Sequence, residues 1–126
     1  NFDYDGIWLA AGADGITVRG NYLGIGVDGV TVKANYGGIA IGSANNVIGG
    51  TAAADRNVIS GNAAYGIELY ASTSAGNLIQ GNYVGTNAAG TAAAANGWGV
   101  AIFGGAHDNT IGGAARKPAR HRERIF

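Results

Sequence analysis

Four aromatic residues and one carboxylate lie on or beside a short, repeated apolar motif, and they are the best candidates for a binding site. They are Trp8, Glu68, Tyr70, Trp98 and Phe103. Exposed aromatic rings on a flat surface can hold sugar rings through apolar contact with the ring face. The same rings could instead pack loops against the body of the protein. The sequence therefore offers a possible ligand-binding site, with polysaccharide as the candidate partner, and a structural alternative.

Catalysis has less support, because the acidic residues do not come in pairs. Glycoside hydrolysis needs two carboxyl groups about 5–9.5 Å apart. Glu68 has no second acid on its strand face, and Asp3 and Asp5 could approach it only if the chain folded back. His107 lies beside Asp108, but no serine in a nucleophile elbow accompanies it. We expect no catalytic residue, with Glu68 as the only candidate.

No metal site and no cofactor are expected. The chain has no cysteine and two histidines, of which one lies in the final residues. The glycine runs are not followed by a helix, so they do not resemble phosphate-binding loops. Four aspartates precede Gly or Asn or lie in loops, where aspartate commonly forms turns. These are Asp14, Asp28, Asp55 and Asp108.

The candidate residues are positioned by a repeat of about 61 residues. The segment GIWLAAGADGITVRGNYLG from Gly6 matches GIELYASTSAGNLIQGNYVG from Gly66. Asn21-Tyr22 recurs as Asn82-Tyr83, and the segment 38–41 recurs as 99–102. Self-similarity at a fixed period is the signature of a solenoid.

Each unit contains two kinds of short strand. The first kind starts at Gly6, Gly38, Gly66 and Gly99. Its alternation predicts an inward column of Ile7, Ile39, Ile67 and Val100 beside Leu9, Ile41, Leu69 and Ile102, and an outward column of Trp8, Ala40, Glu68 and Ala101. The second kind reads ITVRGN (16–21), NVIGG (46–50), NVISGN (57–62), NLIQGN (77–82) and NTIGG (109–113).

Such strands are too short to be stable alone, and frequent glycine disfavours helices. The pattern therefore predicts a coil of stacked parallel strands about 4.8 Å apart, with three strands in each turn. Asparagines should stack at its corners and bond to one another. We expect Asn21, Asn62 and Asn82 in one column and Asn46, Asn57, Asn77 and Asn109 in another.

The phrases NVISGNAAYGIEL (57–69) and GNLIQGNYVGTNAAGT (76–91) resemble the right-handed parallel β-helix of the pectin-lyase-like group. They are especially similar to tandem β-helix repeats of bacterial secreted and surface proteins. The resemblance covers residues 6–113. It implies an all-β, right-handed, single-stranded parallel β-helix of about four coils in two units of about 61 residues.

The resemblance also implies an extracellular or cell-surface location. It favours a structural or adhesive segment with a weakly binding carbohydrate face. The alternative is a polysaccharide lyase or glycoside hydrolase with unrecognised catalytic residues. The Asn-Thr-Asp, paired Asp, Gly-His-Gly and Arg-x-Lys motifs of the galacturonan hydrolases in this group do not occur in the chain.

The remaining expectations concern domain boundaries and partners, and they follow from the distribution of charge and from the point where the repeat ends. Residues 1–115 are acidic and should form one β-helix domain, whereas the basic tail 116–126 should be disordered or non-native. An acidic body argues against nucleic acid as a partner. No run of about 18 apolar residues predicts a membrane span. Open ends of the coil could associate with another copy.

Overall fold

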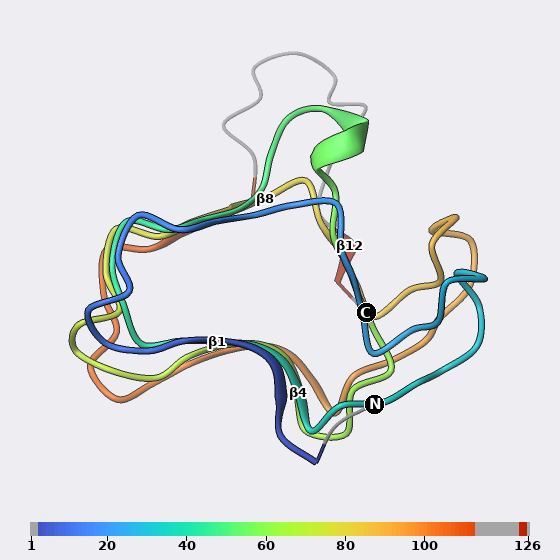
Figure 1. The fold of residues 1–126 in the computed structure, drawn as a ribbon, viewed down its shortest axis with the longest axis horizontal. Coiled ribbons are helices and arrows are strands. Elements are labelled where there is room, and N and C mark those ends of the chain that lie inside the picture. Colours follow the sequence, from blue (N-terminus) through green and yellow to red (C-terminus); the bar gives the residue numbers. More distant parts are fainter. Residues whose placement is uncertain (1–2, 113–123, 126) are drawn as a thin grey trace.

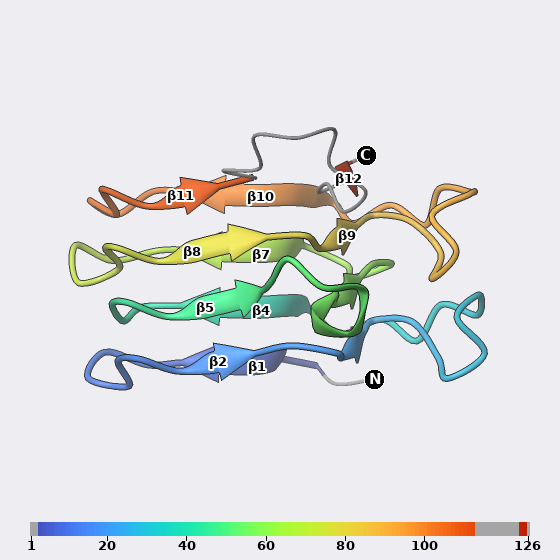
Figure 2. The same ribbon diagram turned by 90° about the horizontal axis from the view of Figure 1, so that it is seen from above.

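The structure is a computed structural model in which residues 3–112 and 124–125 are described. The chain forms a parallel β-solenoid whose turns stack along one axis (Figures 1 and 2). The coil is right-handed, the usual hand of parallel crossovers. No helix among the described residues is long and apolar enough to span a membrane. Most of the predicted basic tail, 116–126, lies outside the described residues.

Each turn contributes one strand to each of three parallel sheets. Sheet A contains β1 (Asp5–Leu9), β4 (Gly37–Ile41), β7 (Tyr65–Leu69) and β10 (Trp98–Ile102). Sheet B contains β2 (Thr17–Val18), β5 (Val47–Gly49), β8 (Leu78–Gln80) and β11 (Thr110–Ile111). Sheet C contains β3 (Tyr22–Leu23), β6 (Val58–Ile59), β9 (Tyr83–Val84) and β12 (Arg124–Ile125). A short 3-10 helix, Ala53–Asp55, precedes β6.

The register of sheet A confirms the predicted columns. Ile7, Ile39, Ile67 and Val100 pair in succession, as do Trp8, Ala40, Glu68 and Ala101. The predicted fold class is therefore correct. The predicted count of about four coils is slightly high, because about three turns connect the first strand of sheet A to the last.

The core is a continuous apolar stack inside the coil. Ile39, Ile41, Ile67 and Leu69 are fully buried between the first and last turns. Burial of such a side chain contributes roughly 1.5–3 kcal/mol relative to leaving it exposed. Ile102 has the same inward position but is 52% exposed, because it lies in the last strand of sheet A. The core therefore depends on neighbouring turns to cover each layer.

The strands of the second kind divide between two sheets. The copy at 57–62 provides β6 in sheet C, whereas the other four copies provide the strands of sheet B. The loop 50–56, which contains the 3-10 helix, separates β5 from β6 within one turn. Similar sequence motifs therefore occupy different sheets, because either sheet can be followed by the same glycine-containing corner.

Within residues 3–112 the asparagines form three ladders rather than the two that we predicted. One ladder joins Asn46, Asn77 and Asn109, the second joins Asn21, Asn57 and Asn82, and the third joins Asn35, Asn62 and Asn96. The predicted grouping was wrong, because it sorted asparagines by neighbouring residues in sequence. Position around the coil decides which amides meet.

Asn77 shows how a ladder residue satisfies its polar groups with protein partners. Its Oδ1 accepts hydrogen bonds from the backbone N–H of Asn46 at 2.9 Å and from Nδ2 of Asn46 at 2.8 Å. Its Nδ2 donates to Oδ1 of Asn109 at 2.9 Å and to the backbone carbonyl of Ser43 at 3.0 Å. Because buried polar groups are costly unless bonded, these contacts fix the vertical register of the turns.

Two long loops, 24–36 and 85–97, project from the same side of the coil (Figures 1 and 2). Each closes on itself through an antiparallel bridge, between Ile25 and Val32 in the first loop. The loops also meet, since the backbone N–H of Ala88 donates to the carbonyl of Gly29 at 2.9 Å. The sheet A strands themselves stay free of these insertions.

Candidate functional site

The outer surface of sheet A carries three columns of residues in register. Together they form what we call the A face: Asp5, Gly37, Tyr65 and Trp98; Trp8, Ala40, Glu68 and Ala101; Ala10, Gly42, Tyr70 and Phe103. All five residues that the sequence singled out for ligand binding lie in these columns. The strand β4 contributes only small residues, so larger side chains from β1 and β7 can lie across it.

Tyr65 crosses β4 to reach β1. Its hydroxyl donates a hydrogen bond to Oδ1 of Asp5, which lies two turns away. The ring passes over Gly37, where a Cβ atom would lie only 2.2 Å from the Tyr65 ring. Glycine at position 37 is therefore required for this contact. Tyr65 is only 8% exposed on an otherwise open face.

Two carboxylates converge on the Tyr65 hydroxyl. Burial raises the pKa of Tyr65 above its usual range, and hydrogen bonding and negative charge from Asp5 and Glu68 raise this pKa further. The phenol is therefore neutral at ordinary pH and acts as a hydrogen-bond donor, not as a base. The structure thus brings Asp5 and Glu68 to the same group, which their separation in sequence did not suggest.

Trp8 makes a second bridge over β4. Its Nε1 donates to the hydroxyl of Tyr70 at 2.7 Å, across 62 residues of sequence. Ala40 lies next to Trp8 in register and is only 2% exposed, consistent with an indole ring above it. Trp8 itself is 67% exposed. The indole therefore packs one part of its surface on the coil and presents the rest to solvent.

Trp98 and Phe103 extend the aromatic surface onto the last turn. Trp98 pairs in register with Tyr65 and is 70% exposed. Phe103 follows β10, bonds through its N–H to the carbonyl of Leu69, and is also exposed. At the opposite end, Tyr4, Asp5 and Trp8 line an open hollow of about 380 Å³. Exposed rings thus lie at both ends of sheet A.

The sequence analysis missed Tyr65 and misplaced Asp5, which reaches the A face as the first residue of β1 and not through a fold-back of the chain. Both directly precede the glycine of a strand of the first kind, as Gly37 and Trp98 also do. Extending the predicted strands by one residue would have placed these four in one column. The contact between Asp5 and Tyr65 could not be inferred in this way, because it skips a turn and needs a glycine between the two side chains.

The remaining titratable candidates do not join the A face. His107 and Asp108 interact at 2.8 Å in the exposed loop between β10 and β11. The backbone N–H of His107 bonds to Ser74, beyond the end of β7. Among residues 3–112, no group of three or more His, Cys, Asp or Glu side chains could hold a metal ion.

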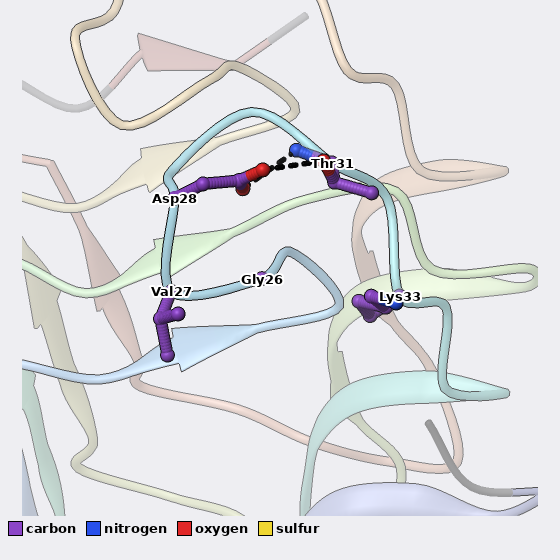
Figure 3. Close-up of a pocket in the computed structure, with 5 residues that line it drawn as sticks. All are labelled: Gly26, Val27, Asp28, Thr31 and Lys33. Atoms are coloured by element: carbon purple, nitrogen blue, oxygen red, sulfur yellow. Dashed lines mark hydrogen bonds between the residues drawn. The ribbon is translucent and has the colours of Figure 1, made fainter.

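Asp28 shapes the tip of loop 24–36 (Figure 3). Its carboxylate accepts hydrogen bonds from the backbone N–H groups of Val30 and Thr31, both at 2.9 Å, and from the Thr31 hydroxyl. These bonds, chiefly that from the Thr31 side chain, lower the pKa of Asp28 to about 2. The adjoining hollow of about 220 Å³ is lined by this turn and Lys33. The predicted turn-forming role of Asp28 agrees with these contacts.

Comparison with known proteins adds no family to this description. No family model, no curated protein and no solved structure matches the chain.

Proposed function

We propose that this chain is a structural or adhesive β-solenoid segment of an extracellular protein, with a weakly binding carbohydrate surface on the A face. The observation that carries this proposal is the exposure of Trp8, Trp98 and Phe103 on one side of a rigid sheet. Aromatic rings held on a rigid surface can contact sugar rings at little cost in conformational entropy.

Oligosaccharide binding by the variant Trp98→Ala tests this proposal. Isothermal titration with the oligosaccharide that binds best in a glycan array should show about fivefold weaker binding, because a lost aromatic contact costs about 1 kcal/mol. Tyr22→Ala is the matched control, since Tyr22 is exposed in sheet C rather than on the A face. Equal loss in both variants, or no glycan binding by the parent chain, would refute a binding role for the A face.

A polysaccharide-active enzyme is the second candidate, favoured by the convergence of Asp5 and Glu68 on Tyr65. Retaining and inverting glycoside hydrolases both use a pair of carboxyl groups. Reducing-sugar and unsaturated-product assays on the bound glycan distinguish the candidates. Turnover that Glu68→Gln abolishes would establish an enzyme, whereas binding without turnover supports the adhesive segment.

Self-association through the ends of the coil is a further part of the proposal. Ile16 and Tyr22 are exposed in the first turn, and Ile102 is exposed in the last described turn of sheet A. Sedimentation velocity over a range of concentrations should show oligomers that Ile102→Ser weakens. A monomer at every concentration would exclude this association. The extracellular location would be tested by fractionating cells that express the protein.

A further inference from the structure

The described charges are unevenly placed around the coil. Asp5 and Glu68 lie on the A face. The cations among residues 3–112 lie elsewhere: Arg19 pairs with Asp55 at 3.4 Å, Arg56 stacks on the ring of Tyr83 at 3.9 Å, and Lys33 lies in loop 24–36 near Asp28. Sheet A therefore combines exposed rings with negative charge that these three cations do not balance.

The carboxylates of the A face have more acceptor capacity than their protein donor can fill. A tyrosine hydroxyl has one hydrogen, so Tyr65 can donate to either Asp5 or Glu68 at one moment. Each ionised carboxylate can accept several hydrogen bonds. A ligand with several N–H donors would supply the hydrogen bonds that Tyr65 cannot.

The aromatic residues around these carboxylates add a second preference for positive charge. The open hollow of about 380 Å³ is lined by Asp5 together with the rings of Tyr4 and Trp8. An ammonium group is attracted to the face of an aromatic ring, most strongly to tryptophan. It also forms charge-assisted hydrogen bonds with carboxylates. Rings and acids at this end of the A face thus recognise the same chemical group.

We propose that the A face selects glycans that carry protonated amines, such as polymers of de-N-acetylated amino sugars. This inference rests on the proposed carbohydrate-binding function. Such a sugar offers an apolar ring face to Trp8 or Trp98 and an ammonium group to Asp5 or Glu68. A polyuronate carries a carboxylate on each sugar and is repelled by the same two acids.

A basic protein segment fits these features less well. A lysine side chain carries its charge at the end of a flexible stem and leaves the exposed rings of Trp98 and Phe103 without a flat partner. A pyranose ring fixes the amine close to an apolar surface. The display of flat rings on β1 and at both ends of β10 therefore favours a glycan over a peptide.

The experiment measures binding of three oligomers of equal length: glucosamine, N-acetylglucosamine and galacturonate. We expect the glucosamine oligomer to bind most tightly and the galacturonate oligomer to bind least, with salt weakening only the glucosamine complex. Glu68→Gln and Asp5→Asn should each weaken glucosamine binding about threefold. Asp108→Asn is the matched control, because Asp108 is an exposed acid away from the A face, and its binding should be unchanged.

Each other outcome overturns a distinct part of the proposal. If the acetylated and free oligomers bind equally well and Trp98→Ala weakens both complexes, the A face binds carbohydrate but does not select amines. Tight binding of galacturonate would also reject it. Polylysine binding that needs Asp5 and Glu68 but not Trp98 would assign the face to a basic protein. Binding of none of these probes or array glycans would refute both proposals. Because Asp5→Asn replaces the carboxylate that accepts the hydrogen bond of Tyr65 with a neutral amide, Glu68→Gln and a thermal melt of each variant separate binding loss from unfolding.

Discussion

Tyr65 is the residue that most clearly ties the A face together. It joins turns of the coil that are not neighbours and holds a phenol between two acids. Its raised pKa means that the folded protein retains the phenol proton more strongly than the unfolded chain does. This contribution to stability is fully present below pH 10, the ordinary tyrosine value, and is lost as pH rises above it.

The substitution Tyr65→Phe should reveal how much the Tyr65 hydroxyl contributes to the free energy of unfolding. We expect the variant to be about 1 kcal/mol less stable than the parent at neutral pH, because it loses the hydrogen bond to Asp5. Between about pH 9 and about pH 11, its stability should fall less than that of the parent. Urea denaturation at a series of pH values measures both effects, with the exposed Tyr22→Phe as the control. An unchanged alkaline slope in Tyr65→Phe would contradict the assigned environment.

Gly37→Ala tests whether the small residues of β4 make room for the bridging rings. The new Cβ would lie 2.2 Å from the Tyr65 ring and 2.5 Å from Oδ1 of Asp5. We expect a loss of about 2 kcal/mol in unfolding free energy, because overpacking forces the ring to move. Gly26→Ala is the matched control, since its nearest neighbour would be 3.4 Å away. Equal stability of the two variants in urea denaturation would show that Tyr65 does not lie over β4.

At the scale of elements, the asparagine ladders hold the corners while the apolar columns fill the centre. Buried ladder asparagines bond both to each other and to backbone carbonyls of neighbouring turns, as Asn77 does. An end residue such as Asn21 has a ladder partner on one side among the described residues. Interior positions should therefore contribute more to stability than end positions.

Asn77→Ala should destabilise the protein by about 3 kcal/mol, because it leaves buried donors and an acceptor of adjacent turns unsatisfied. Asn21→Ala should cost about 1 kcal/mol, because this residue lies at the partly exposed start of its ladder. Thermal and urea denaturation of both variants measure the difference. If Asn21→Ala were as destabilising as Asn77→Ala, the interior of the ladder would have no special role.

Local alternation was sufficient to predict sheet A, because Gly-Ile-x-Leu strands place apolar residues on one side wherever they occur. It was insufficient for the ladders, because loops of different length decide which corner Asn57 or Asn62 reaches. The outward position of Trp8 was predicted by the same alternation, whereas Trp98 precedes the predicted strand and was expected only to lie beside it. The pairing of Asp5 with Tyr65 could not be predicted from the alternation. The two residues lie on strands that are not neighbours, and their contact depends on a glycine in the strand between them.

At the scale of the whole molecule, the solenoid places residues from equivalent positions of the sequence repeat side by side on its surface. Residues about 60 positions apart, such as Trp8 and Tyr70, become neighbours on one face. The loops 24–36 and 85–97 project from another part of the coil than sheet A (Figure 1). A glycan lying along the coil axis would contact side chains from β1, β7 and β10.

Titration of the ¹⁵N-labelled protein with a glucosamine oligomer, followed by NMR, tests this account most directly. The chain has two tryptophans, so each indole N–H can be followed separately. We predict that both indole signals shift, together with backbone amides of β1, β4, β7 and β10. Shifts confined to loops 24–36 and 85–97 or to sheets B and C, with both indole signals unmoved, would contradict the assignment of the A face as the binding surface.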